Sequence, residues 1–100
     1  MKKYIVIVEA TLTNEGTQSV SFQEYSKKAT VNNTKYGAIV KEKYIISENI
    51  AQGLTSSLII ILEFPSKENA QKAFSNEEYL SLISLRESAF KELKILMTAE

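Results

Sequence analysis

The sequence predicts an α+β fold with the element order β-α-β-β-α-β. Two stretches, Tyr4–Thr11 and Leu58–Phe64, are rich in β-branched residues and apolar at almost every position, which is typical of strands covered on both faces. Two further strand-like stretches, Ala38–Ile46 and Leu93–Thr98, carry lysines, which is typical of sheet edges. The simplest right-handed arrangement is a ferredoxin-like, four-stranded antiparallel sheet in the order 4-1-3-2, with its helices on one face.

A helix is predicted between the first and second strands. Ser21 and Glu24 have the spacing of a capping box, with Ser21 as the N-cap. Val20 and Tyr25 have the spacing of a hydrophobic staple around that cap. Gly37 is a natural stop for the helix, because glycine readily adopts the left-handed conformation that commonly ends one.

The segment between the third and fourth strands is predicted to form one bent helical unit. Pro65 ends the third strand, and Ser66 is placed to cap a short helix that runs through about Phe74. Asn76 is placed to cap the next helix, since two glutamates follow it where the helix end is positive. The buried side of this second helix is expected to include Tyr79, Leu82 or Ile83, and Arg86 or Phe90 at its far end.

The composition excludes several classes of function. Twelve basic residues balance twelve acidic ones, so no net charge attracts nucleic acid or an anionic membrane surface. The chain contains neither Cys nor His, which removes disulfides, thiolate nucleophiles, the usual neutral-pH proton shuttle and the common zinc ligands. We therefore predict no metal and no cofactor.

The length predicts one domain over residues 1–100. The longest apolar runs fall far short of the ~20 residues that span a bilayer, so no membrane segment is expected. The apolar run near the N-terminus is interrupted early by Glu9 and lacks a signal-peptide cleavage site, so a cytoplasmic location is the default expectation.

The two central strands are apolar on both faces. Ile5 and Ile7 point opposite to Val6 and Val8, and the third strand alternates in the same way. Helices on one face leave the other as an apolar surface larger than soluble monomers usually tolerate. We therefore predict a two-fold homodimer with its sheets packed face to face. The alternatives are that the helices wrap around the sheet, or that the outer ends of the strands are less apolar than they look.

Several segments resemble one known family in their order and spacing. They are Tyr4-Ile5-Val6-Ile7-Val8, Phe22-x-x-Tyr25, Tyr36-Gly37, Ile61-Leu62-Glu63-Phe64-Pro65-Ser66, Ala70 with Ala73, Asn76-Glu77-Glu78-Tyr79, and Leu85-Arg86. The resemblance covers essentially the whole chain and is to the domain-of-unknown-function 1330 family within the dimeric α/β-barrel superfamily. It implies a ferredoxin-like fold, a homodimer whose two sheets form a barrel, a pocket between sheet and helices, and no established reaction.

Related branches of that superfamily include cofactor-free monooxygenases, muconolactone-isomerase-like enzymes and chlorite-dismutase-like haem proteins. Haem bound through an axial His is excluded by the composition, so an enzyme here would resemble the monooxygenases or isomerases. The chain departs from the usual family pattern in a longer turn before the first helix, through Thr17 to Val20. It also has Thr55-Ser56-Ser57 where a basic residue is expected, which weakens the case for an anion site there.

Four side chains are candidates for contacting a ligand, namely Arg86, Tyr25, Tyr79 and Glu63. Arg86 is the only arginine and would suit a carboxylate ligand, although a structural ion pair would also explain it. Glu63 could act as a base if it is buried, or it could pair with a basic side chain such as Arg86. The tyrosines could present hydroxyls to a pocket, or they could be core rings with wet hydroxyls.

Two functions remain open on the sequence alone. The chain could bind or transform a small carboxylated or aromatic molecule in a pocket between sheet and helices, or it could be a non-catalytic homodimeric module that regulates or scaffolds. An enclosed pocket with Arg86 at its wall would favour the first function. A space filled by Phe22, Phe74 and Phe90 would favour the second.

Overall fold

The computed structural model describes residues 3–99, and its elements confirm the predicted fold class. Four strands form one antiparallel sheet in the order β2-β3-β1-β4, which is the predicted order read from the other edge. The strands are β1 (Tyr4–Leu12), β2 (Ile39–Ile45), β3 (Leu58–Phe64) and β4 (Phe90–Met97). The helices are α1 (Val20–Lys35), α2 (Lys67–Ala73), α3 (Glu77–Leu80) and α4 (Ile83–Ala89), with a 3-10 turn η1 at Gly16–Gln18.

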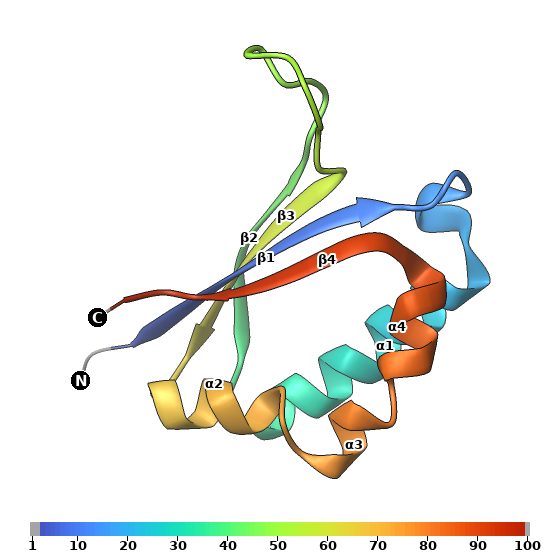
Figure 1. The fold of residues 1–100 in the computed structure, drawn as a ribbon. Helices are drawn as coiled ribbons and strands as arrows, with labels where there is room; N and C mark the ends of the chain where they lie inside the picture. The colour runs from blue at the N-terminus through green and yellow to red at the C-terminus, as the bar shows by residue number, and fades with distance from the viewer. Residues whose placement is uncertain (1–2, 100) are drawn as a thin grey trace.

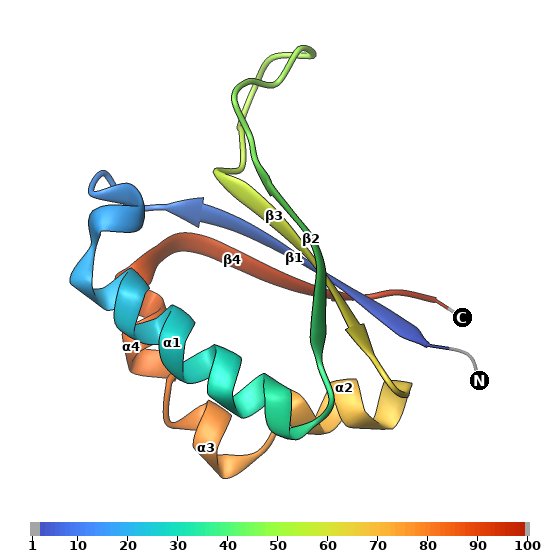
Figure 2. The ribbon, with the colours of Figure 1, turned by 180° about the vertical axis from the view of Figure 1, so that it is seen from behind.

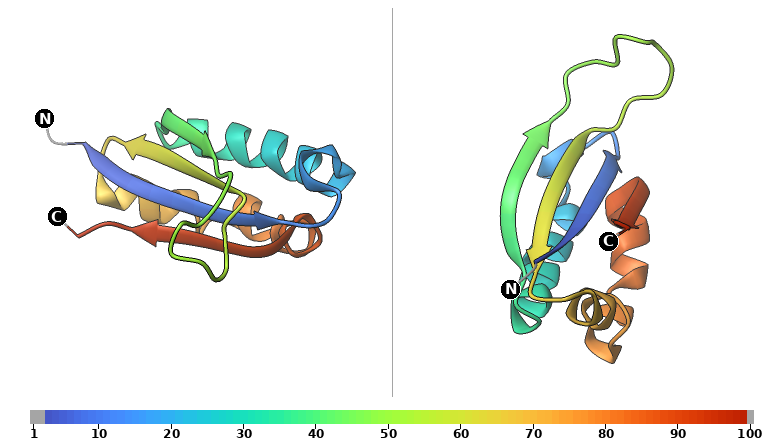
Figure 3. Two further views of the ribbon diagram at one scale, coloured as in Figure 1. Left: turned by 90° about the horizontal axis from the view of Figure 1, so that it is seen from above. Right: turned by 90° about the vertical axis from the view of Figure 1, so that its left-hand side faces the viewer.

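All helices lie on one face of the sheet (Figure 1). α1 runs beside the series from α2 to α4, and no helix or strand within residues 3–99 covers the opposite face (Figures 2 and 3). The loop of residues 46–57, between β2 and β3, rises on the side away from the helices. The helices therefore do not wrap around the sheet.

The core lies between the sheet and the helices. Tyr4, Val6 and Ala10 of β1 are buried on the helix side, together with Leu58 and Phe64 of β3. The intervening residues of both strands point to the other face, because side chains alternate along a strand. β2 is exposed along its whole length, which agrees with its position at the edge of the sheet.

The start of α1 differs from the predicted one by two residues. The N-cap is Ser19 rather than Ser21, since the Ser19 hydroxyl accepts a hydrogen bond from the Phe22 N–H at 3.2 Å. Val20 is the first helical residue and 78% exposed, so the predicted hydrophobic staple is wrong. The preceding η1 turn positions the cap, because the Ser19 N–H donates to the Gly16 carbonyl at 3.2 Å.

The end of α1 is closed by Gly37, as predicted. The Gly37 N–H donates to the Thr34 carbonyl at 3.0 Å and the Ala38 N–H to the Asn33 carbonyl at 3.2 Å, which is the Schellman pattern. Gly37 has a φ of +84°, and a Cβ at this position would lie 2.6 Å from Cγ of Pro65. The backbone conformation and the neighbouring proline both require glycine here.

The boundaries after β3 also differ from the prediction. The predicted bent unit consists of three short helices, because Asn76 caps α3 separately by accepting from the Tyr79 N–H at 3.0 Å. β4 begins at Phe90 rather than Leu93, since the chain passes directly from α4 into the strand. Phe90 is therefore a strand residue opposite Leu12 of β1, not the end of a helix.

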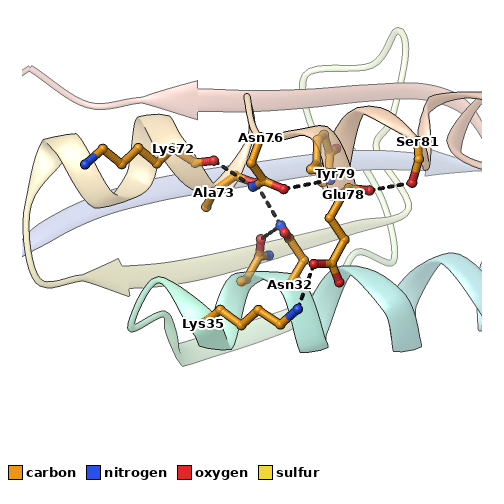
Figure 4. Close-up of polar contacts among 9 residues, drawn as sticks. Asn32, Lys35, Lys72, Ala73, Asn76, Glu78, Tyr79 and Ser81 are labelled. Carbon is orange, nitrogen blue, oxygen red and sulfur yellow. Dashed lines mark hydrogen bonds and ion pairs between the residues drawn. The ribbon is translucent and has the colours of Figure 1, made fainter.

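A buried asparagine joins α1 to the junction between α2 and α3 (Figure 4). Asn32 is fully buried, and its side-chain amide donates to the Ala73 carbonyl at 2.7 Å. Asn76 donates to the same carbonyl at 3.1 Å. Because Asn76 also caps the turn that carries Tyr79, these bonds fix the position of Tyr79 relative to α1.

We expect the substitution Asn32→Ala to lower the free energy of unfolding by about 1–2 kcal/mol, because it removes the bond that joins the two helical segments. Chemical denaturation followed by circular dichroism measures the change. Thr34→Ala is the matched control on an exposed position of the same helix, and we expect it to stay within about 0.5 kcal/mol of the parent. Equal effects of the two substitutions would contradict a structural role for Asn32.

Candidate functional site

A cavity of about 210 Å³ lies between the sheet and α1. Aliphatic side chains of β1, β3 and β4 form its sheet side, among them Val8, Ile60 and Leu62. Aromatic residues complete the lining, and they are Phe22, Tyr25, Phe74 and Phe90. The cavity is therefore chiefly apolar and aromatic, which is the usual character of small-molecule sites.

The polar residues that line the cavity come from one side of α1 and from β2. Ser26, Thr30, Asn33 and Thr34 lie along α1, and Lys43 lies on β2. Thr30, Thr34 and Lys43 are exposed, so this polar group marks the mouth of the cavity. Lys43 is the only charged side chain among the described residues that line it.

The aromatic rings at the other end of the cavity pack edge to face. The rings of Tyr25 and Phe90 have centroids 5.3 Å apart, and those of Phe22 and Phe90 are 5.7 Å apart. Phe74 packs against Tyr79 at 5.3 Å in the same manner. Edge-to-face contacts of this kind stabilise aromatic clusters beyond their burial, so the walls of this end are well fixed.

A chain of three polar side chains ends at this aromatic wall. The hydroxyls of Tyr25 on α1 and Tyr79 on α3 are 2.7 Å apart, which is a hydrogen bond in which either can donate. A guanidinium N–H of Arg86 on α4 donates to the Tyr79 hydroxyl at 3.1 Å. The guanidinium carbon also lies 5.8 Å from the centroid of the Tyr79 ring, in a cation–π contact.

Burial and these contacts shift the pKa values of the two end groups, Tyr25 and Arg86, upward. Burial raises the pKa of the Tyr25 hydroxyl well above its ordinary value, and the neighbouring Tyr79 adds to the increase, while the Arg86 charge opposes it. Partial burial lowers the pKa of Arg86, but the hydrogen bond and charge interaction with Tyr79, together with the charge interactions with Tyr25 and Glu87, outweigh this effect and leave it raised. At neutral pH Tyr25 therefore keeps its proton and Arg86 keeps its charge.

The structure brings together three of the four candidate residues from the sequence. Tyr25, Tyr79 and Arg86 form the chain, but of the three only Tyr25 lines the cavity. Arg86 borders a separate, shallow depression beside Phe90. The two conditions stated for distinguishing the functions give different answers. Phe90 and the other phenylalanines line the cavity rather than fill it, which is against the scaffold. Arg86 is not at the cavity wall, which is against the binding site as first expected.

Glu63 lies on the opposite face of the sheet. Its β1 partner is Ile5, and its neighbours Leu62 and Phe64 point toward the helices. Its carboxylate pairs with the Lys41 ammonium at 4.0 Å, not with Arg86. Glu63 is therefore separated from the cavity by the sheet itself.

The outer face of the sheet carries an apolar patch in the described chain. Register places Ile7 of β1 opposite Ile61 of β3 on this face, and neither is covered by a helix. We use the term outer patch for the side chains on this face, which are Ile5, Ile7, Ile39, Tyr44, Ile59, Ile61 and Leu96. Ile39, Tyr44 and Leu96 are exposed, while the four central isoleucines are half-buried by their strand neighbours.

Polar pairs border the outer patch at both ends. The Lys41–Glu63 pair lies at one end. At the other end the Glu9 carboxylate accepts a hydrogen bond from the Ser56 hydroxyl at 2.7 Å and lies 3.8 Å from the Lys94 ammonium. Ser56 belongs to the Thr-Ser-Ser segment that departs from the family pattern, so that segment has a structural role here.

Two findings concern metals and membranes. No helix among residues 3–99 is long and apolar enough to cross a membrane. Within the same residues, no cluster of three or more Asp or Glu side chains is arranged to hold a metal ion. The polar groups at the cavity are hydroxyls, one amide and one ammonium group.

Fold and site together define a ferredoxin-like α+β protein with a chiefly apolar cavity, open at its mouth, between its sheet and its first helix. The chain belongs to the family described as domain of unknown function (DUF1330), which matches residues 3–99. No curated protein matches the sequence significantly.

Solved structures with low sequence identity share the fold. A protein of unknown function from Rhodopseudomonas palustris has a TM-score of 0.78 at 13% identity, covering 98% of this chain and 83% of that one. A dimeric protein of unknown function with a ferredoxin-like fold, from Bacteroides fragilis, has a TM-score of 0.62 at 10% identity, covering 98% and 96%. SnoaB, a cofactor-independent oxygenase from Streptomyces nogalater, has a TM-score of 0.63 at 8% identity, covering 100% and 96%.

Proposed function

We propose that residues 1–100 act as one domain that forms a homodimer through the outer faces of two sheets and binds a small molecule in the cavity of each copy. The observation that carries the binding proposal is the chain from Arg86 through Tyr79 to Tyr25, which ends at an otherwise apolar wall. Burying polar side chains costs free energy unless all of their donors and acceptors are hydrogen-bonded. A series of buried polar side chains that ends at a cavity therefore favours a ligand with a hydrogen-bond acceptor.

The number of protons available decides which group donates in each hydrogen bond between Arg86, Tyr79 and Tyr25. Arg86 can only donate, so the Tyr79 oxygen accepts from it. If Tyr25 also donated to Tyr79, the proton of the almost fully buried Tyr79 hydroxyl would need another acceptor. If Tyr79 donates to Tyr25 instead, the Tyr25 proton is left for an acceptor in the cavity. The second arrangement satisfies every group once a ligand oxygen is bound.

The size and lining of the cavity limit the ligand to a small body. A volume of about 210 Å³ is below the ~300–1,000 Å³ of pockets for drug-sized molecules. Phe22, Tyr25 and Phe90 offer edges and faces to which an aromatic ring can pack. One ring or a short aliphatic chain that carries an oxygen acceptor fits these features.

The role proposed for Tyr25 is donation of a hydrogen bond rather than removal of a proton. Its raised pKa keeps the hydroxyl protonated at neutral pH, and a protonated hydroxyl can polarise a carbonyl or carboxylate oxygen but cannot act as a base. The proposal is therefore a binding module, and a reaction would have to come from the ligand or from a co-substrate.

The dimer is supported by the outer patch and by the projecting loop. Ile50 and Leu54 in this loop are 90% and 97% exposed, and the loop rises on the same side as the outer patch (Figure 3). A second copy packed on this side would remove both surfaces from water, and burial of apolar surface drives association. The structurally similar protein from Bacteroides fragilis is dimeric.

The binding proposal is tested with acetophenone and ethylbenzene, which share a ring and differ in the carbonyl acceptor. We expect both to bind the parent, with acetophenone about fivefold tighter, and Tyr25→Phe to remove only that advantage, because the change deletes one hydroxyl. Chemical-shift titrations measure the affinities. Tyr36→Phe, at the C-terminal end of α1 and outside the lining of the cavity, is the matched control. Absence of binding by both compounds, or an unchanged preference in Tyr25→Phe, would overturn the proposal.

A further inference from the structure

A bulge in β2 decides which of its charged side chains faces the cavity. Val40 pairs with Leu62 of β3, and Lys43 pairs with Ile60, so all four point to the helix side of the sheet. Residues three apart in a regular strand point to opposite faces. The register shift between Val40 and Glu42 inserts one residue and thereby brings Lys43 to the same face as Val40.

The consequence for the cavity is a reversal of charge at its mouth. Without the bulge, a regular strand that keeps Val40 inward would turn Glu42 and Tyr44 to the cavity side. With the bulge, Glu42 pairs with Ile61 on the outer face, and Lys43 lines the cavity instead. The neighbouring Lys41 lies on the outer side with Glu63. Bulges often redirect a side chain next to a functional site. The bulge in β2 places the ammonium group of Lys43, rather than the carboxylate of Glu42, at the cavity.

The surroundings of Lys43 leave its charge open to a ligand. Within residues 3–99, Lys43 takes part in no ion pair, and no carboxylate lines the cavity beside it. Across the mouth stands α1 with the amide of Asn33 and the hydroxyl of Thr30. The Asn33 oxygen accepts from Asn32 at 3.2 Å, which leaves the Asn33 amide N–H groups as free donors among the described contacts.

We propose that the cavity takes a small monocarboxylic acid, with its apolar body among the aromatic side chains and its carboxylate at the mouth, paired with Lys43 and within reach of Asn33. The Tyr25 hydroxyl at the other end would bind a second, neutral oxygen on the body of the ligand, so acids without such an oxygen probe the mouth alone. This inference rests on the proposed function and names the class of ligand. Lys43 is exposed, so water solvates its ammonium group when no anion is bound; a neutral ligand would gain nothing from this charge, and a cation would meet a like charge. A dicarboxylic acid would place its second charge against the apolar lining, at a high desolvation cost.

The test compares four acids with their primary amides, which have the same shape and no charge. The acids are benzoate, phenylacetate, 3-phenylpropionate and octanoate, and their affinities for the full chain are measured by calorimetry and chemical-shift titration. We expect the best acid to bind about two- to fivefold tighter than its amide, which is the range of a solvent-accessible ion pair. We also expect this preference to fall as salt is added.

Lys43→Gln is expected to remove the preference for the acid and to leave amide binding unchanged. Lys41→Gln is the matched control, since it removes the same charge two residues away on the outer side of the sheet. Amides that bind the parent as tightly as the acids would overturn this inference and leave the binding function standing. An equal loss of the preference for the acid in Lys43→Gln and Lys41→Gln would also overturn this inference and leave the binding function standing. Failure of all eight compounds to bind would overturn the inference together with the proposed function.

Discussion

The substitution Gly37→Ala is expected to destabilise the fold by about 3 kcal/mol, from two separate costs. Gly37 has a φ of +84°, a conformation that costs a non-glycine residue about 1–2 kcal/mol. The new Cβ would in addition lie 2.6 Å from Cγ and 2.9 Å from Cδ of Pro65, whose ring cannot swing aside as a long side chain can. A loss of about 3 kcal/mol is a large part of the 5–15 kcal/mol that stabilises a typical domain.

Gly16→Ala separates the two costs. Gly16 also has a positive φ, of +60°, but a Cβ there meets nothing within 4 Å. We expect it to cost only about 1 kcal/mol, and thermal unfolding should show a shift roughly one third of that in Gly37→Ala. Adding Pro65→Ala to Gly37→Ala should recover part of the loss, because it removes the ring atoms that the new Cβ would meet. Equal shifts in the two single variants would refute the steric argument.

The sheet topology could be predicted because it depends on a global pattern. β1 and β3 are apolar on both faces and β2 carries charges, and only central strands tolerate the first pattern while edges favour the second. The boundaries were less predictable because they depend on local hydrogen bonds. Ser19 and Ser21 are equally good caps by residue type, and the η1 turn before Ser19 decided between them.

The residues of the candidate site could be predicted from the sequence, but the contacts between them could not. Tyr25, Tyr79 and Arg86 were identified by residue type, but their contact joins three separate helices and is not encoded in any local spacing. The position of Glu63 on the outer face follows from simple alternation with its buried neighbours. Lys43 was missed, because it looks like one more charge on an edge strand until the bulge in β2 reverses its direction.

Ile61→Glu is expected to convert the proposed dimer, of twice 11.3 kDa, into a monomer of 11.3 kDa. Ile61 lies at the centre of the outer patch, opposite Ile7. In a two-fold interface each substitution appears twice, so two carboxylates would be buried without partners. An unpaired buried charge costs several kcal/mol, so the dissociation constant should rise by at least about 100-fold. Sedimentation equilibrium over a range of protein concentrations measures the shift.

Val31→Glu makes the same kind of change on an exposed position of α1, away from the sheet, and should leave the dimer intact. Circular dichroism must show that the Ile61→Glu monomer is still folded, because an unfolded chain would also lose the dimer. Leu54→Glu then tests the projecting loop independently, since this side chain is almost fully exposed in one copy and cannot affect its core. If the loop packs against the partner, Leu54→Glu weakens the dimer without changing the thermal stability of the separated monomer. A parent protein that sediments as a monomer at micromolar concentration would refute the face-to-face dimer. Such a result would show that burial of the outer patch does not drive association.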